Sequence, residues 1–211
     1  GISSIDYLII THYDKDHIGG APTLLKKYKV SKLFEPDYTP VDTTAYAYVS
    51  YRNALTEAKA NGKCGSTEAV SDSVDLDIKL NIVGTFGKDY AKNQDNNDSL
   101  VVSLEHLGNS FLFAGDIEKQ RIADMLSQGR VQPCDFLKVP HHGSTTSSSL
   151  GFLEAVSPEY AIISVGKGNS YGHPDYDTIQ KLKQVNAEIY RTDELGTINI
   201  VFSADDIKIT Y

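Results

Sequence analysis

The pattern of apolar and polar positions along the chain predicts an α/β protein. Residues 5–10 form a short, apolar, β-rich run typical of a buried strand, and residues 74–80 alternate with a period of two, as a half-exposed strand does. One helix is predicted to open at Gly19, Gly20 and Pro22 and to end near Tyr28. Further strands are predicted over residues 30–34, 99–107, 110–114, 136–139 and 160–165, and further helices over 43–61, 117–127, 147–156 and 176–185.

The order of these elements indicates how the chain is organised. Strands and helices alternate in its middle, hairpins occur at residues 99–114 and at the C-terminus, and an Asp/Asn/Gly-rich loop covers 84–98. Two or three short strands are expected to finish the chain. No internal repeat or low-complexity linker interrupts the 211 residues. The sequence therefore predicts mixed sheets in a single domain over residues 1–211.

Composition and charge exclude several classes of protein. Hydrophobic residues make up 40% and charged residues 23%, which excludes collagen-like, coiled-coil and intrinsically disordered chains. No apolar run approaches the roughly 20 residues of a transmembrane helix. The 20 Lys and Arg against 28 Asp and Glu give a net charge of −8 without a basic stripe, which argues against tight, non-specific DNA binding. The two cysteines, Cys64 and Cys134, form no framework.

The densest group of chemically active residues lies directly after the first predicted strand. His12 and Asp14 are two apart, so in extended backbone they point the same way and can bind one ion. Asp16 and His17, at the turn into the helix, can face a second ion. Imidazole and carboxylate ligands together suit Zn, Mn or Fe. The alternative interpretation is a polar turn with an aspartate at a helix N-cap.

This segment resembles the ligand motif of the metallo-β-lactamase superfamily. The pattern His-x-Asp-x-Asp-His-x-Gly-Gly at residues 12–20 is similar, more narrowly, to the C-terminal domain of ComEC-type competence proteins and their stand-alone relatives. The likeness continues at residues 97–100, 113–116, 137–144, 164–174 and 190–193. It implies an αββα sandwich of mixed sheets. That fold usually has several strands before the motif, so we expect an incomplete N-terminal sheet, and Asp14 stands where the superfamily usually has a second histidine.

The resemblance also implies roles for individual residues. Asp116 would bridge two metal ions, although a helix N-cap near Ile117 is an alternative. His142 is assigned as a ligand and His141 as a second-layer or substrate contact, with the reverse left open. The implied metal ligands are His12, Asp14, Asp16, His17, Asp116, His142 and His173. The implied catalytic residues are Asp16, His141 and Glu118, of which His141 or Glu118 would shuttle a proton or hold the substrate. Asn169 is an implied substrate contact, and His173 is an alternative one. Lys167, between Gly166 and Gly168, is a candidate contact for an anionic substrate, and the alternative is a loop lysine in water.

These roles predict a metal-dependent hydrolase of the phosphodiesterase or nuclease type. A metal-bound hydroxide would attack the substrate at a dinuclear site holding two divalent ions, Zn or Mn, with mononuclear occupancy left open. Three converging aspartates would repel one another without metal. The substrate would be nucleic acid or a small phosphodiester. The alternatives are a non-catalytic binding module and a lactam, lactone or thioester hydrolase. The resemblance favours an extracytoplasmic location, and the oligomeric state is left open.

Overall fold

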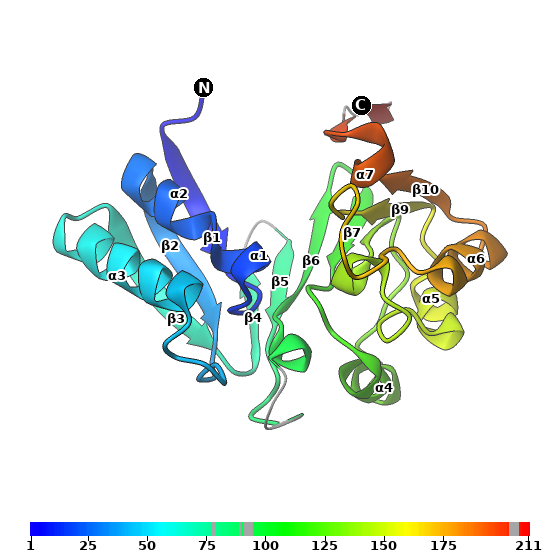
Figure 1. Ribbon diagram of the computed structural model, residues 1–211, viewed down its shortest axis with the longest axis horizontal. Helices are drawn as coiled ribbons and strands as arrows, with labels where there is room; N and C mark the ends of the chain where they lie inside the picture. Colours follow the sequence, from blue (N-terminus) through cyan, green and yellow to red (C-terminus); the bar gives the residue numbers. More distant parts are fainter. Residues whose placement is uncertain (77–78, 89, 91–94, 203–206) are drawn as a thin grey trace. The chain divides into compact units, whose positions relative to one another are not determined.

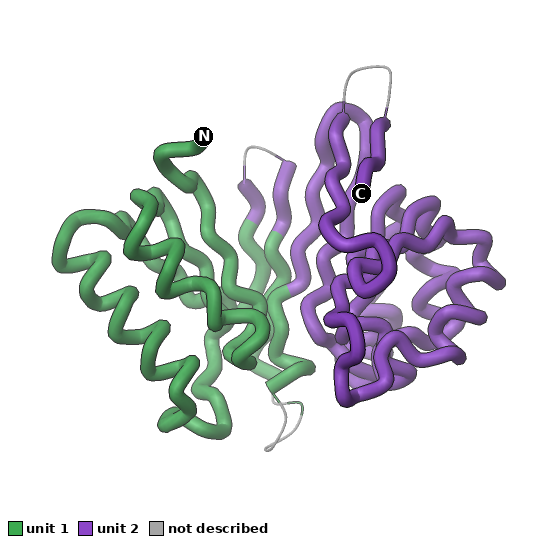
Figure 2. Tube along the Cα trace, turned by 45° about the horizontal axis from the view of Figure 1, so that its top comes forward, with its two compact units in different colours: residues 1–74, 82–100 green, residues 75–81, 101–211 purple. Residues whose placement is uncertain are grey.

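The computed structural model describes residues 1–76, 79–88, 90, 95–202 and 207–211. Over these residues the chain forms two compact units, coloured separately in Figure 2. Unit 1 comprises residues 1–74 and 82–100, and unit 2 comprises residues 75–81 and 101–211. Each unit has helices, strands and a buried core of its own, so each is described by itself.

Unit 1 is built on a small parallel sheet. Its strands β1 (Ser4–Ile9), β2 (Lys29–Pro36) and β3 (Cys64–Val70) lie in the order β1-β2-β3. Val30 in the central strand pairs with Ile5 on one side and with Cys64 on the other. Figure 1 shows helices α2 and α3 side by side along this sheet. The helical elements of unit 1 are α1 (Lys15–Ile18), α2 (Ala21–Lys27), α3 (Tyr46–Ala60) and the 3₁₀ turn η1 (Asn96–Asp98).

The core of unit 1 forms where these helices meet the sheet. Along α3, the buried residues Tyr51, Ala54, Leu55 and Ala58 recur three and four positions apart, which places them on one face of the helix. They join Leu33 and other buried residues of the sheet in one hydrophobic cluster. The buried carboxylate of Glu35 lies at this boundary, where it accepts hydrogen bonds from the Tyr51 hydroxyl (2.7 Å) and the Arg52 guanidinium (3.0 Å).

Unit 2 contains most of a large mixed sheet. The strand order is β10-β9-β8-β7-β6-β5-β4; β6 and β7 are antiparallel, whereas β7 to β10 are parallel. Figure 1 shows α5 and α6 on the same side of β9 and β10, and α4 contacts α5. The strands are β4 (Ser73–Leu76), β5 (Leu80–Val83), β6 (Val101–His106), β7 (Asn109–Phe113), β8 (Phe136–Lys138), β9 (Tyr160–Ile163) and β10 (Glu188–Arg191). The helices are α4 (Lys119–Ser127), η2 (Pro140–Gly143), α5 (Leu150–Val156), α6 (Tyr176–Gln184) and α7 (Thr192–Leu195).

Side chains alternate between the two faces of this sheet. Leu112, Leu137 and Ala161 are neighbours in register and are buried. On the opposite face, the ring of Phe136 stacks between those of Phe111 and Tyr160, at centroid distances of 4.9 and 4.6 Å. A separate antiparallel pair, β11 (Asn199–Phe202) and β12 (Ile207–Thr210), adds Phe202, whose ring meets Phe111 and Phe136 edge-on.

Most of the predicted elements are confirmed, and the differences have identifiable causes. The single strand predicted over 74–80 is wrong: β4 ends at Leu76, and Lys79 stands in the left-handed region (φ 54°) before β5 begins. Residues 77 and 78 of that prediction lie outside the described part of the chain, as do 89 and 91–94 of the predicted loop. The strand β3 and the short helix α7 were not predicted. Cys64 and Cys134 are both buried and free.

Among the described residues, none of the helices combines the length and the hydropathy needed to cross a bilayer.

We predict that Tyr51→Phe destabilises unit 1. The substitution removes the hydroxyl that donates to the buried Glu35 carboxylate, and a buried acceptor that loses its donor costs about 1–3 kcal/mol. Urea unfolding should show this loss, whereas Tyr46→Phe, on a side chain 87% exposed at the start of the same helix, should leave the transition where it is. Equal transitions for both variants would contradict the role given to Glu35.

Candidate functional site

The first set of candidate ligands belongs to unit 1 and follows strand β1. The strand direction continues past Ile9, because the Ile10 N–H donates to the Phe34 carbonyl and the Leu100 N–H donates to the Thr11 carbonyl (2.9 and 2.8 Å). His12 is fully buried, and its Nε2 lies 3.8 Å from an Asp14 carboxylate oxygen. At the start of α1, the Nε2 atom of His17 lies 3.5 Å from an oxygen of Asp16. Two histidine–carboxylate pairs thus stand within residues 12–17.

Thr11 orients both histidine rings of this set. Its hydroxyl lies 3.3 Å from Nδ1 of His12 and 3.3 Å from Nδ1 of His17, and the two rings stand 4.0 Å apart. The Nε2 atoms are therefore the ring nitrogens nearest the carboxylates. Sequence reasoning missed Thr11, although its position directly before His12 is a signal that could have identified it.

Tyr13 anchors the segment between the two histidines to the core of unit 1. Its hydroxyl donates to the Pro36 carbonyl, and its N–H donates to the Tyr38 hydroxyl, both at 3.2 Å. Burial raises the pKa of Tyr13 above its ordinary value, and the nearby Glu35 carboxylate adds to this effect. Tyr13 therefore stays a neutral donor. Tyr13 lies between His12 and Asp14 in the chain, so its two hydrogen bonds limit how far either residue can move.

The contacts of Asp14 and Asp16 do not support the alternative interpretation, in which this segment is only a polar turn with an aspartate capping a helix. Asp14 does occupy the N-cap position of α1, but its side chain makes no capping hydrogen bond. Asp16 lies in the first turn of the same short helix, and its side chain is 61% exposed. The carboxylates of Asp14 and Asp16 are directed instead towards His12 and His17.

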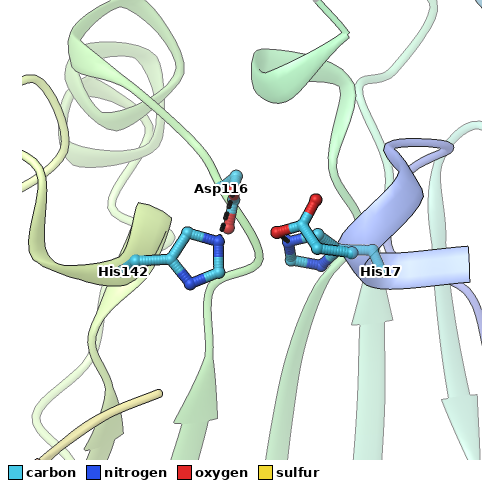
Figure 3. Close-up of side chains that lie close together, drawn as sticks. His17, Asp116 and His142 are labelled. Atoms are coloured by element: carbon cyan, nitrogen blue, oxygen red, sulfur yellow. Dashed lines mark ion pairs between the residues drawn. The ribbon is translucent and has the colours of Figure 1, made fainter. Parts of the chain in front are cut away.

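The second set of candidate ligands belongs to unit 2 and is centred on Asp116, just after strand β7. The Asp116 side chain is only 5% exposed, and one of its oxygens lies 3.5 Å from Nε2 of His142 (Figure 3). Asp116 is not the helix cap considered above, because the N-cap of α4 is Glu118. A buried carboxylate facing an imidazole is costly to keep unless a cation or further donors compensate its charge.

His142 is held in the orientation that a metal-binding histidine needs. Its Nδ1–H donates to the Ser164 carbonyl at 2.7 Å, so Nε2 is the unprotonated nitrogen of the neutral ring and faces Asp116. Thr192 fixes the segment that carries this carbonyl, since its hydroxyl accepts from the Val165 N–H and donates to the Val165 carbonyl. Neither Ser164 nor Thr192 was predicted to act here.

The backbone at His142 is unusual. His141, His142 and Gly143 all have positive φ, at 47°, 53° and 87°, in the region that side-chain-bearing residues avoid. The His141 N–H donates to the Gly115 carbonyl (3.2 Å), which ties this turn to the residue before Asp116. A Cβ atom at Gly143 would stand 2.6 Å from Cβ of Pro174. The turn therefore requires glycine at that position and displays two adjacent histidines.

His141 has a different partner from His142. Its Nδ1 lies 3.2 Å from a Glu118 oxygen, and the Thr146 hydroxyl donates to the same carboxylate at 3.0 Å. Within unit 2 the structure thus brings His142 to Asp116, and His141 to Glu118. Thr146 was not predicted, but its place in the Ser/Thr-rich run after Gly143 is a signal for it.

The last predicted residues lie on the loop that follows strand β9. The ring of His173 is 5.6 Å from that of His141, and its Nδ1 lies 3.4 Å from Asp175. Burial lowers the pKa of His173, an effect that the Asp175 carboxylate opposes. Lys167 on the same loop is exposed. The side-chain amide of Asn169 bonds to the backbone of its own loop.

The donor geometry within each unit fits a divalent metal. Two ligand atoms bound to one tetrahedral ion at about 2.0–2.1 Å stand about 3.3 Å from each other. The imidazole–carboxylate separations of 3.5, 3.5 and 3.8 Å are close to this value and longer than a hydrogen bond. Asp16, His17, Asp116 and His142 each offer an atom that can bind a metal ion.

Comparison with known proteins identifies the family. Residues 1–167 match the metallo-beta-lactamase superfamily. The chain belongs to this superfamily. The superfamily consists generally of metal-dependent hydrolases and typically binds divalent metals, so the donor sets described above occur in a family whose chemistry uses them.

Relatives with a known name connect this member of the superfamily to competence proteins. The chain is 35% identical over 202 residues to ComE operon protein 3 of Bacillus subtilis, covering 94% of this chain and 25% of the relative. It is 28% identical to Recombination protein 2 of Haemophilus influenzae and 27% identical to Competence protein ComA of Neisseria gonorrhoeae, covering 97% and 99% of this chain. It spans only about a quarter of the length of these relatives. The predicted resemblance is confirmed.

A solved structure supports the fold. CmlA, a diiron beta-hydroxylase from Streptomyces venezuelae, matches 90% of this chain and 44% of its own at a TM-score of 0.55, with 14% identity. At that identity the match concerns the fold alone. The predicted superfamily fold with its mixed sheet is confirmed, with a separate small parallel sheet at the N-terminus.

We predict that Gly143→Ala destabilises the protein more than a comparable glycine substitution elsewhere. Gly129 also has a positive φ (66°), but a Cβ there would meet nothing within 4 Å, so Gly129→Ala tests backbone strain alone, at about 1–2 kcal/mol. Gly143→Ala adds the clash with Pro174, worth a further ~1–3 kcal/mol. Thermal unfolding of both variants measures the difference; equal melting temperatures would contradict the close approach at Gly143.

Proposed function

We propose that this chain hydrolyses phosphodiesters with the help of divalent metal ions bound by the histidines and carboxylates of the two candidate sets described above. The observation that carries the proposal is that one arrangement occurs in both sets. In each set the Nδ1 atom of a histidine is bonded to a backbone or hydroxyl oxygen, and its Nε2 atom faces a carboxylate. Such bonding fixes the tautomer and orientation of metal-binding histidines.

The proposed ligands follow from these contacts. His142 is preferred to His141, because His142 faces Asp116 whereas His141 faces Glu118. His173 is proposed for the second ion, and the aspartate-rich set favours Mn or Zn. Bound divalent ions would polarise a phosphoryl oxygen and lower the pKa of a water molecule from about 15.7 towards 7. The complete proposed set is His12, Asp14, Asp16, His17, Asp116, His142 and His173.

Two groups of this chain are proposed to move protons. Asp16 is accessible to water at 61% side-chain exposure, and its carboxylate accepts a proton from the attacking water. His141 directs Nδ1 towards Glu118, so its Nε2 is the atom that donates a proton to the leaving oxygen. Glu118 stabilises the charged ring, and the Thr146 hydroxyl holds Glu118 in place.

The substrate class rests on the family branch and on charge. The named relatives include two competence proteins and a recombination protein, which supports a nucleic-acid substrate for this chain. The net charge of −8 does not favour long-range attraction of DNA, so a small phosphodiester is the second candidate. Lys167, exposed on the loop of His173, supplies a positive charge for a phosphate in either case.

We also propose that units 1 and 2 form one metallo-β-lactamase-like domain.

We predict that the purified protein binds about two divalent ions per chain, measured by plasma mass spectrometry after loading with Mn²⁺ or Zn²⁺. Asp116→Ala should lose half of the metal or all of it, because the substitution removes the buried carboxylate that faces His142. Asp177→Ala, on an exposed carboxylate paired with Lys181, is the matched control and should keep the full content. Absence of metal from the wild-type protein would favour the non-catalytic binding module.

We predict turnover of a chromogenic phosphodiester or a short single-stranded oligonucleotide, and none of a cephalosporin. His141→Ala should lower kcat by 10²-fold to 10⁴-fold, the usual contribution of general acid–base catalysis, with metal content kept. Comparing the two phosphodiesters separates the nuclease from the small-molecule enzyme. Robust hydrolysis of the cephalosporin would instead support the lactam, lactone or thioester hydrolase.

A further inference from the structure

The loop between β9 and α6 is organised by a single side-chain amide. The Asn169 Oδ1 atom accepts from the backbone N–H groups of Tyr171 (3.2 Å) and His173 (3.1 Å). The Asn169 Nδ2 group donates to the backbone carbonyls of Gly166 (3.1 Å) and His173 (2.7 Å). Both ends of the loop and its middle are thus bonded to one residue.

These bonds use the full hydrogen-bonding capacity of the amide. A primary amide has two N–H donors and two acceptor sites, and all four are directed at the backbone of the loop. A substrate could hydrogen-bond to Asn169 only by displacing one of them. The geometry therefore does not support the substrate contact that the sequence suggested for this residue.

Beyond these bonds, the Asn169 N–H donates to the Gly166 carbonyl (3.2 Å) and the rings of Tyr171 and His173 stack at 6.0 Å. Gly166, Lys167, Gly168, Ser170, Tyr171 and Gly172 are all exposed, and the segment contains no helix or strand. Gly168 and Gly172 have positive φ, at 68° and 76°, which lets the chain fold back on Asn169. In a segment with so few buried contacts, side-chain-to-backbone hydrogen bonds set the conformation.

The residue most constrained by Asn169 is His173. Its N–H and its carbonyl are both bonded to the same amide, so its backbone position is defined on both sides. Its side chain, 14% exposed, lies against Asp175 and the ring of His141. Asp175 is fixed in turn, since its N–H donates to the Gly143 carbonyl and its carboxylate accepts from the Thr145 N–H.

We propose that Asn169 is a positioning residue that acts through His173. It holds the backbone of His173 so that the imidazole is presented at the unit 2 ligand set, and it touches neither metal nor substrate itself. This inference rests on the proposed function, in which His173 binds the second ion. Without the four bonds, the imidazole samples other orientations, and ions and substrate bind less tightly.

The variant that isolates this role is Asn169→Asp. It keeps the size and the two acceptor positions, but it replaces both N–H donors with a carboxylate oxygen facing the carbonyls of Gly166 and His173. Asn109→Asp is the matched control, because Asn109 also donates to a backbone carbonyl in an exposed turn, at Leu107. Neither substitution removes a buried side chain, so both variants should fold.

The test is a double-mutant cycle with His173→Ala, read by Mn²⁺ titration and by kcat/KM on a chromogenic phosphodiester. Asn169→Asp should weaken metal affinity about tenfold or more, within the range for residues that orient a metal ligand, whereas Asn109→Asp should change it less than twofold. In the His173→Ala background, Asn169→Asp should have almost no further effect, since its target is gone. In the apo protein, Asn169→Asp should also speed amide hydrogen exchange at His173.

The outcomes separate the two proposals. If wild type binds metal but Asn169→Asp leaves the affinity and kcat/KM unchanged, or causes an equal loss in both backgrounds, the positioning role is overturned and the proposed function stands. If the wild-type protein neither binds Mn²⁺ nor cleaves the phosphodiester, the proposed function fails and this inference fails with it.

Discussion

The constraint on which the unit 2 site depends is the backbone at residues 141–143. Three successive residues stand in the left-handed region, two of them histidines, and such conformations persist only where the surroundings enforce them. The enforcing contacts are the bond from the His141 N–H to the Gly115 carbonyl and the close approach of Gly143 to Pro174. The turn directs adjacent side chains to different carboxylates, so His141 contacts Glu118 and His142 contacts Asp116.

Unit 1 arrives at a similar result by a different local structure. There the ligands alternate along extended backbone and continue into a short helix, and Tyr13 anchors the chain between them. In both units an uncharged oxygen lies against Nδ1. In unit 1 it is the Thr11 hydroxyl, and in unit 2 it is the Ser164 carbonyl, which accepts from the His142 Nδ1–H. Orientation by neutral groups leaves the carboxylates available to a cation, which is consistent with a family of metal-dependent hydrolases.

Much of the fold and the choice of ligand types could be predicted from the sequence, because both rest on local patterns. Apolar runs gave β1 and β7 to β9, and the dense His/Asp segment with the His141-His142-Gly143 turn pointed to metal chemistry. The strand β3 escaped because Cys64–Val70 is neither apolar throughout nor alternating, and it is defined by its pairing with β2. The break at Lys79 depends on backbone conformation that no residue pattern indicated.

The groups that orient the ligands were harder to predict. Ser164 acts through its carbonyl, which every residue has, so its side chain gave no signal. Thr146 and Thr192 act on groups that are 28 and 27 residues away in sequence. Asn169 was predicted as a substrate contact, and its four bonds to the backbone escaped prediction because they depend on how its loop closes. Such contacts follow from tertiary structure rather than from composition or spacing.

The most direct test of the central claim is anomalous diffraction from crystals of the Mn²⁺-loaded or Zn²⁺-loaded protein. We predict anomalous peaks at the candidate ligands, with His12 or His17 bound to an ion in unit 1 and Asp116 and His142 bound to an ion in unit 2. The absence of a peak at either set, in a protein that is loaded and folded, would contradict the account.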